Sequence, residues 1–154
     1  MTSNVLTKST QWICINCNET RSGHQLLVQV IPSRSRYHSV WQSFERGENT
    51  LCVSNEILEE YTEILQKLTD DETAEVVLST ILNSSFVCFI TPYFKFNLIA
   101  ADPDDNKFVD CALASGARFL ISNDHHYDIL KHIDYPKVDV VTINEFINSP
   151  NDNM

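Results

Sequence analysis

The 154-residue sequence contains only three glycines, so it has no glycine-rich loop of the kind that cradles a nucleotide phosphate. It also lacks any apolar run near the roughly 18 residues that a membrane-spanning helix needs, and no signal-peptide pattern opens it. Basic residues are scarce, because 11 lysines and arginines face 21 aspartates and glutamates, for a formal net charge of −10. This balance argues against nonspecific electrostatic binding of nucleic acid, although metal ions at an acidic site can neutralise phosphates.

The cysteines do not form a disulfide framework. Their number is odd, five in all, and they are scattered along the chain, which is typical of a reducing cytoplasm. Cys14 and Cys17 form a single C-x-x-C pair with His24 nearby, which would suit zinc, but one pair without a second is a weak signal. Burial of Cys14 in a strand is the alternative. The length and a hydrophobic content of 43% indicate one globular domain, and we expect it to be cytoplasmic.

Short apolar runs alternate with segments of helical periodicity along the chain. We expect strands at residues 12–15, 51–53, 87–90, 119–121 and 138–141. Helices are expected at 33–47, 54–68, 70–83, 102–116 and 125–132, and from residue 144 onward. A further apolar run covers residues 26–31 and is stopped by Pro32. The alternation predicts an α/β fold with a central parallel sheet that carries helices on both faces.

The stretch 101–128 concentrates acidic residues around one expected helix and one expected strand. Asp105 lies in the first helical turn, on the same face as the apolar stripe, whereas Asp110 falls on the opposite side. Asp124 follows the strand 119–121. Because ligands bind at the carboxyl ends of parallel strands, we expect Asp105 and Asp124 to converge on a hard divalent cation. A helix cap and a turn, each purely local, form the alternative explanation.

A third acidic residue comes from the helix that Ser54 is expected to cap. Of the four glutamates in this helix, Glu60 lies closest to the apolar stripe, about 40° beyond Ile64 by the helical period. We therefore expect Glu60 to reach toward the edge of the core while the other glutamates stay in solvent. The carboxyl groups of Glu60, Asp105 and Asp124 should then lie within about 10 Å of one another, since a shared metal bonds oxygen at close range.

Two further groups of polar residues need an explanation. Arg34, Arg36 and His38 make up the one basic patch that includes an aromatic residue, and they open a predicted helix, so they are candidates for binding an RNA phosphate. A solvated helix start is the alternative. His125 and His126 follow Asp124 directly, and because adjacent histidines cannot both face one site, we expect them on the surface.

Three spaced motifs in this sequence resemble the PIN-domain family, in particular the branch of toxin components of toxin–antitoxin systems. They are Ser54–Tyr61, Asp102–Phe108 and Ser122–Asp124, and the segments 34–38 and 91–93 are also similar to that branch. The resemblance covers about residues 26–148. It divides the chain into an atypical N-terminal segment at 1–25, a PIN-like domain at 26–148 and a frayed tail at 149–154.

Membership of this family implies a metal-dependent ribonuclease that uses a cluster of four acids with Mg²⁺ or Mn²⁺. By motif position, Glu60, Asp105 and Asp124 would take three of the four places. Asp102 and Asp104 would be their neighbours, and Asp128 would assist from outside. The partners implied are an RNA substrate, an antitoxin protein and a second copy of the chain in a homodimer, with no membrane.

The first family motif, a strand that ends in Asp-Thr-Asn, is absent. One alignment register places Asn16-Cys17-Asn18 there, after the strand 12–15, and the other places Gly23-His24-Gln25 there, with no good strand before it. We favour the first register, which makes Asn16 a degenerate metal ligand. An altered reading frame before about residue 25 would explain why the likeness begins abruptly.

The missing carboxylate bears on the activity that we expect. An asparagine oxygen can coordinate a cation but removes one full negative charge from the site. The sequence therefore predicts a PIN-domain endoribonuclease with reduced or lost activity. The alternative is a non-catalytic PIN fold that binds a protein or RNA.

Overall fold

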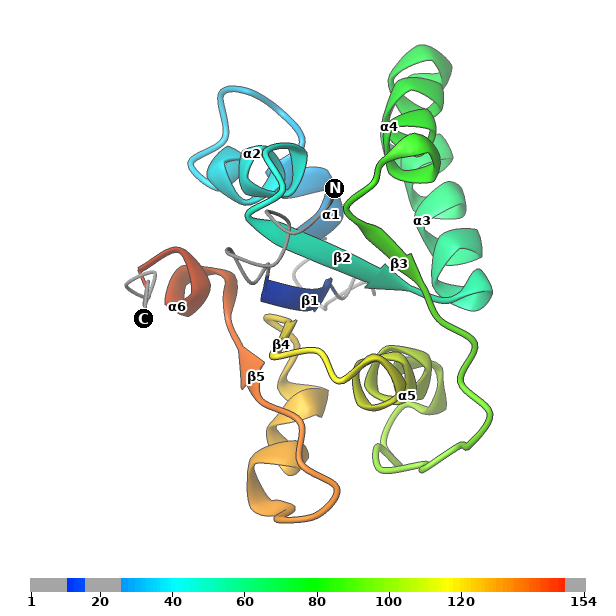
Figure 1. The fold of residues 1–154 in the computed structure, drawn as a ribbon, viewed down its shortest axis with the longest axis vertical. Helices are drawn as coiled ribbons and strands as arrows, with labels where there is room; N and C mark the ends of the chain where they lie inside the picture. The colour runs from blue at the N-terminus through cyan, green and yellow to red at the C-terminus, as the bar shows by residue number, and fades with distance from the viewer. Residues whose placement is uncertain (1–10, 16–25, 149–154) are drawn as a thin grey trace, which may run out of the picture.

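The computed structural model describes residues 11–15 and 26–148, and its core is a single parallel sheet (Figure 1). The sheet has five strands in the order β3-β2-β1-β4-β5, and every pair of neighbours is parallel. The strands are β1 (Gln11–Ile15), β2 (Asn49–Val53), β3 (Val87–Phe89), β4 (Phe119–Ile121) and β5 (Val140–Val141). The predicted α/β fold with a central parallel sheet is confirmed.

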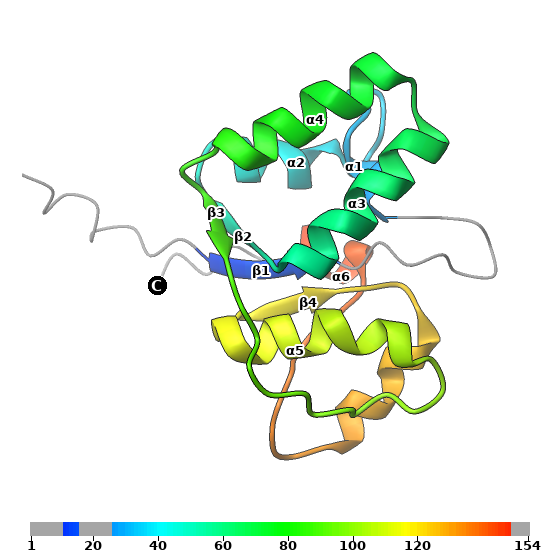
Figure 2. The same ribbon diagram turned by 90° about the vertical axis from the view of Figure 1, so that its right-hand side faces the viewer.

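Helices cover both faces of this sheet, as the alternating pattern predicted. Helices α1 to α4 lie on one face and α5 lies on the other (Figure 2). The helical segments are α1 (Leu26–Val30), α2 (His38–Glu45), α3 (Asn55–Leu68), α4 (Asp71–Asn83), the 3₁₀ turn η2 (Pro103–Asp105), α5 (Asn106–Ser115), the 3₁₀ helix η3 (His125–His132) and α6 (Ile143–Asn148). None of the helices in the described parts of the chain is long and apolar enough to cross a membrane.

The strand predicted near the N-terminus lies at the centre of the sheet. In β1, Ile13 pairs with Leu51 of β2 on one side and with Phe119 of β4 on the other. Ile13 and Cys14 are fully buried. Asn16 follows this strand in the sequence, but it lies outside the described residues, as do residues 17–25. Its place as a ligand, and the domain boundaries at 25 and 148, remain predictions.

The segment after β1 differs from the expected pattern in where its helices begin. The apolar run 26–31 forms α1, which buries Leu26, Leu27 and Val30. The next helix begins at His38 rather than near Ser33, because residues 32–37 form turns. In these turns the Ser35 hydroxyl accepts a hydrogen bond from the Tyr37 N–H (3.1 Å), a local bond that competes with helix formation.

The helical hairpin of α3 and α4 begins each helix at a capping side chain. The Ser54 hydroxyl accepts the N–H of Ile57 at 3.3 Å, and the Asp70 carboxylate accepts the N–H of Thr73 at 2.7 Å. Each bond satisfies one of the backbone donors that a helix start leaves without a partner. The predicted stripe of α3 is buried at Ile57, Tyr61 and Leu65, although its last member, Leu68, is exposed.

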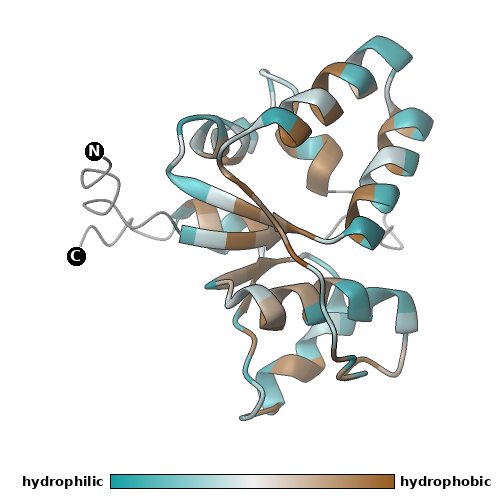
Figure 3. Ribbon diagram, turned by 45° about the vertical axis from the view of Figure 1, so that its right-hand side comes forward, coloured by the Kyte–Doolittle hydropathy of each residue, from teal (hydrophilic) through white to brown (hydrophobic). Residues whose placement is uncertain are grey.

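Helix α5 carries the central acidic stretch and packs against β1, β2 and β4. Its residues Phe108 and Val109 are fully buried, and brown hydrophobic segments also run along β3 and β4 (Figure 3). The helix ends at Gly116, whose φ of 69° lies in the left-handed region that favours glycine. Both the helix and its stop were predictable from the local sequence.

Candidate metal centre

The order of the strands marks one place on the sheet where a ligand pocket is expected. From β1 the chain builds outward to β2 and β3 on one side and to β4 and β5 on the other. The reversal of strand order lies between β1 and β4. In open parallel sheets, ligands bind outside the carboxyl ends of the strands at such a switch point. Asp124 follows β4 at this position, and η3 begins immediately after it.

Three carboxylates meet around one imidazole beside this switch point. The Nδ1 atom of His126 lies 3.1 Å from Oδ2 of Asp105, 3.4 Å from Oδ1 of Asp124 and 3.9 Å from Oδ2 of Asp102. The candidate ligand atoms of Asp102, Asp105 and His126 all lie within 4.8 Å of one another. The Asp105 side chain is fully buried, whereas that of His126 is 43% exposed. We call these four residues the acidic cluster.

The prediction that both neighbouring histidines lie on the surface is wrong for His126. His125 is 96% exposed and pairs with Asp128 at 3.2 Å. His126 points instead into the acidic cluster. Adjacent residues of η3 project in different directions, as expected of a 3₁₀ helix, so one histidine of the pair faces the acids. Asp128, which was expected to assist the site, bonds to His125 and to Lys131 (3.5 Å).

Local hydrogen bonds hold the acidic cluster in place. The Asp124 carboxylate accepts the N–H of His126 at 2.9 Å, which positions the start of η3. The hydroxyl of Tyr127, a fully buried residue, donates to the backbone carbonyl of Asp105 at 3.3 Å. The two sequence segments that supply the acids are therefore joined directly, although 19 positions separate Asp105 from Asp124 in the sequence.

Two buried polar residues of α5 fasten the loop that leads into the cluster. The Asn106 side chain donates to the carbonyl of Ile99 and accepts its N–H, each at 2.9 Å. The Asp110 carboxylate accepts the N–H of Phe96 at 3.1 Å. Asp110 was placed on the side of the helix opposite to the apolar stripe, and it is nevertheless buried because this loop covers it. Burial raises the pKa of Asp110, partly offset by its bond to Phe96.

Glu60 is half-buried, as predicted, and its partner is a lysine. The Nζ atom of Lys107 lies 2.8 Å from Oε1 of Glu60, and this lysine is only two residues beyond Asp105. The neighbouring Tyr61 donates its hydroxyl to the carbonyl of Ile15 (2.7 Å), which anchors α3 at the carboxyl end of β1. Glu60 therefore comes from a helix anchored at the same edge of the sheet. Its convergence with Asp105 and Asp124 within about 10 Å stays a prediction.

The basic residues 34–38 pack beside α6. Arg36 Nη2 and the Tyr37 hydroxyl both donate to Oδ1 of Asn144, at 3.3 and 3.2 Å. The next residue toward the N-terminus, Ile143, donates its N–H to Oδ1 of Asn123 at 3.1 Å, and Asn123 adjoins Asp124. Arg34 is exposed, whereas His38 bonds through Nδ1 to the carbonyl of Val30 at 2.9 Å. These contacts place the basic segment next to the elements that carry the acidic cluster.

The structure gives little support to a zinc site at Cys14. This residue is fully buried in β1, and Cys17 and His24 lie outside the described residues. The pKa of the Cys14 thiol is raised well above its usual value, first by hydrogen bonding with Cys111 and then by that with Cys52. Zinc is bound by the thiolate, so a thiol held neutral by neighbouring cysteines is better explained as part of the core.

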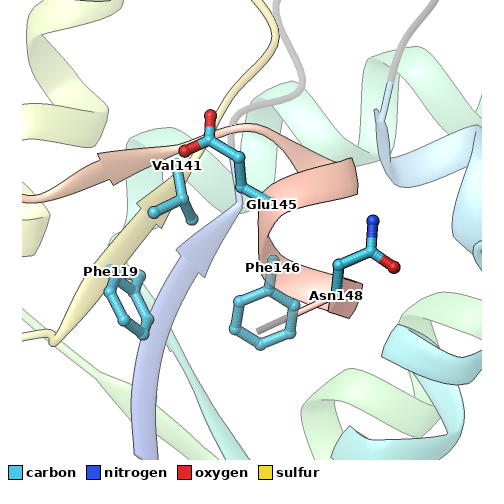
Figure 4. A pocket seen from close by; sticks show the side chains of 5 residues that line it. All are labelled: Phe119, Val141, Glu145, Phe146 and Asn148. Carbon is cyan, nitrogen blue, oxygen red and sulfur yellow. The ribbon is translucent and has the colours of Figure 1, made fainter. Parts of the chain in front are cut away.

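A pocket elsewhere on the molecule is unrelated to these acids. It has a volume of about 310 Å³ and is lined by Phe119, Val141, Glu145, Phe146 and Asn148 (Figure 4). The rings of Phe119 and Phe146 meet edge to face at 6.1 Å, and the Glu145 carboxylate points away from them. Phe119 begins β4, so the pocket lies toward the opposite end of that strand from Asp124.

The donors of the acidic cluster fit a divalent cation. Three carboxylates surround one imidazole, and one of those carboxylates belongs to a fully buried residue. Buried and crowded carboxylates repel each other unless a cation neutralises them. Oxygen donors suit Mg²⁺ and Mn²⁺, and imidazole adds a nitrogen donor. The residues could therefore hold one ion with Asp105 at its buried side.

Comparisons with known proteins agree with this architecture. A family model described as "PIN domain" matches residues 25–126, a span that includes Glu60, Asp105, Asp124 and His126. No curated protein matches the sequence. A solved structure of VapBC2 from Rickettsia felis, bound to a DNA fragment from their promoter, matches with a TM-score of 0.56 and 16% identity, over 86% of this chain and 98% of that chain. At this identity the likeness concerns the fold alone.

Proposed function

The chain belongs to the PIN domain family, and from this premise we propose that it is a metal-dependent endoribonuclease of reduced activity. The observation that carries the proposal is the meeting of Asp102, Asp105, Asp124 and His126 at the sheet's switch point. The family match and this geometry are independent, because the first rests on sequence and the second on the fold. The reduction in activity follows from asparagine at position 16, where the family motif has an aspartate.

Each residue has a role that its surroundings support. Asp105 and Asp124 hold the ion, with Asp102 at the more exposed side, and Glu60 joins them from α3 at the same edge of the sheet. When bound, Mg²⁺ or Mn²⁺ activates water and stabilises charge on the scissile phosphate. The buried Asp105 carboxylate is well suited to this role, because electrostatic interactions are stronger away from water.

The basic segment would position the RNA. Arg34 is exposed, and Arg36 is held against Tyr37 with its guanidinium 5.1 Å from the ring centre. Guanidinium groups bind phosphates through paired hydrogen bonds. His38 keeps one ring nitrogen on the Val30 carbonyl, which leaves Nε2 for a contact with the strand. The chain would bring the RNA backbone past α6 toward Asp124.

We also infer a biological setting for this activity. The three motifs resemble toxin components of toxin–antitoxin systems, and the matched fold belongs to a VapBC2 complex that binds promoter DNA. We propose that this chain is such a toxin, acts in the cytoplasm and is neutralised by an antitoxin protein. Homodimerisation is part of the same proposal.

A non-catalytic PIN fold that binds protein or RNA is the second candidate. Two observations favour it. The first-motif aspartate is missing from the sequence, and the Glu60 carboxylate is already paired with Lys107 at 2.8 Å. Under this alternative the acidic cluster would bind an ion weakly or not at all, so metal binding separates the two candidates.

The test restores the missing charge. Asn16→Asp should raise Mg²⁺- or Mn²⁺-dependent cleavage of RNA substantially, because the fourth carboxylate strengthens binding of the ion that activates water. Asp105→Asn in the same background should abolish the gain, since both residues would act on one ion. The melting temperature of both proteins should be measured with and without millimolar metal, because an ion that binds the native state stabilises it.

The results distinguish the candidates. A folded Asn16→Asp protein that cleaves no RNA with either ion would point to the other register, and Gly23→Asp becomes the next substitution. If that variant is also inactive and the melting temperature ignores both ions, the binding module is the better account.

A further inference from the structure

We propose that His126 is a metal ligand and that its imidazole makes the site prefer late first-row transition ions, such as Co²⁺ and Zn²⁺, over Mg²⁺. This inference rests on the proposed metal centre and assigns its ion specificity. It goes beyond the family resemblance, which implies an all-carboxylate site. It concerns a residue whose side chain was expected to point into solvent.

The geometry of His126 is that of a donor directed into the site. One ring nitrogen, Nδ1, lies within 4 Å of carboxylate oxygens from three aspartates. No other histidine in the described part of the chain is part of the group that could hold an ion. The orientation is supported by the backbone, because the N–H of His126 donates to the Asp124 carboxylate at 2.9 Å. The ring and the carboxylates therefore come to the ion together.

The chemistry of the donors then decides which ion fits. Mg²⁺ takes oxygen ligands in near-octahedral geometry and loses its waters reluctantly. Imidazole suits zinc, copper, iron and nickel, and affinities of mixed nitrogen and oxygen sites rise along the series from Mn²⁺ to Cu²⁺. Replacing one oxygen donor by nitrogen therefore costs Mg²⁺ more than it costs Co²⁺ or Zn²⁺. A missing carboxylate at position 16 moves the balance in the same direction, because it removes one hard, charged ligand.

The neighbouring histidine provides a matched control. His125 has the same chemistry and adjoins His126 in η3, but it is 96% exposed and pairs with Asp128. His125→Ala should leave ion binding unchanged. His126→Ala removes the nitrogen donor, and His126→Asp replaces it with oxygen. Together, the three variants separate a ligand from a histidine that is merely nearby.

The experiment uses the metal-free full chain and two readouts that do not depend on activity. Co²⁺ is titrated while its visible absorption is recorded, because the band shifts and strengthens when nitrogen replaces oxygen. The melting temperature is then followed over a range of Co²⁺, Zn²⁺ and Mg²⁺ concentrations to obtain each affinity. We expect the unaltered chain to bind Co²⁺ at least about tenfold more tightly than Mg²⁺.

The variants should change this ratio in opposite ways for the two ions. His126→Ala should weaken Co²⁺ about 10- to 100-fold, with a much smaller loss for Mg²⁺, and should remove the nitrogen-dependent band. His126→Asp should raise the affinity for Mg²⁺ and bring the ratio toward one. Should the alanine variant fail to fold, His126→Asn serves in its place, because the amide offers oxygen in a side chain of similar size.

Other outcomes overturn the inference. Equal losses for Co²⁺ and Mg²⁺ in His126→Ala, or an unchanged ratio in His126→Asp, would show that the imidazole is not a ligand. If Asp105→Asn abolishes binding of every ion while the His126 variants leave the ratio alone, the proposed metal centre stands and only this inference fails. If no ion binds the unaltered chain or Asn16→Asp, both fail together.

Discussion

The amino-terminal end of α5 carries two arrangements of charge that differ in their balance. In one, Lys107 meets Glu60 at 2.8 Å, so one cation faces one carboxylate, and both side chains are largely covered. In the other, a single imidazole faces the carboxylates of Asp102, Asp105 and Asp124. The first is complete within the protein, and the second has an excess of negative charge. The difference teaches that burial of an acid does not identify a site, whereas an uncompensated group of acids does.

The balanced pair is stable over a wide range of pH. Burial lowers the pKa of Lys107, but its hydrogen bond to Glu60 and the negative charges of Glu60, Asp104 and Glu56 raise it further, so the net shift is upward. A raised pKa means that the pair's contribution to stability is complete below the unfolded value of about 10.4 and is lost as pH rises through the folded value. The pair therefore persists at neutral pH.

The largest expected effect comes from the unbalanced arrangement. Asp105→Asn should remove the rise in melting temperature with metal and lower RNA cleavage about 100-fold or more, measured in whichever background cleaves, because it takes one charge from the buried side of the ion. Asp110→Asn is the matched control, since it lies on the same helix, is also buried, and bonds to a backbone N–H. An equal loss of metal response in both variants would contradict the distinction between the two acids.

The next effect tests the balanced arrangement. Lys107→Met should cost about 1.5–3 kcal/mol in the free energy of unfolding by urea, because it leaves the partly buried Glu60 carboxylate without this charged partner. It should also enlarge the stabilisation by metal, since the edge of the sheet then has one more uncompensated acid. Glu60→Gln in the same background should recover part of the loss. A variant as stable as the unaltered chain, with the same metal response, would argue against the pair.

A third test asks whether the surplus negative charge is matched by the basic segment on the side of the substrate. Arg34→Ala with Arg36→Ala should weaken RNA binding about tenfold at low salt and reduce the salt dependence by about two contacts. Arg46→Ala is the control, because this arginine caps the other end of α2 and pairs with Glu48 at 3.1 Å. If the control weakens binding as much, the effect is one of net charge and not of this segment.

The smallest effect concerns the buried acid outside the cluster. Burial raises the pKa of Asp110, so the folded state favours its protonated form. The corresponding stability is present below the unfolded pKa of about 3.9 and is lost as pH rises through the folded value. Asp110→Asn should therefore become relatively more stable as pH rises above about 4, by less than about 1 kcal/mol. Unfolding curves at several pH values would show it, with Asp134→Asn as an exposed control, and a difference of opposite slope would contradict it.

Local sequence was sufficient for much of the fold, since the relevant forces act between near neighbours. A serine followed by a helical stripe predicted the cap at Ser54, and a glycine after the last apolar position predicted the stop at Gly116. The strand at 12–15 was recognisable from its apolar run, and its pairing shows why it is buried on both faces. Residues 34–38 were less predictable, because turn-forming serines delayed the helix to His38.

The sequence by itself determined the residue types that could form a site and the approximate place of each in a strand, helix or turn. Only the tertiary structure decided which of them meet. A helical period gives the face that Asp110 occupies but not the loop that covers it, and it does not reveal that Lys107 reaches Glu60 from 47 positions away. The direction of His126 depended on η3 being a 3₁₀ helix packed beside Asp105. Contacts between distant segments depend on how the elements pack, so no local pattern of residues contains them.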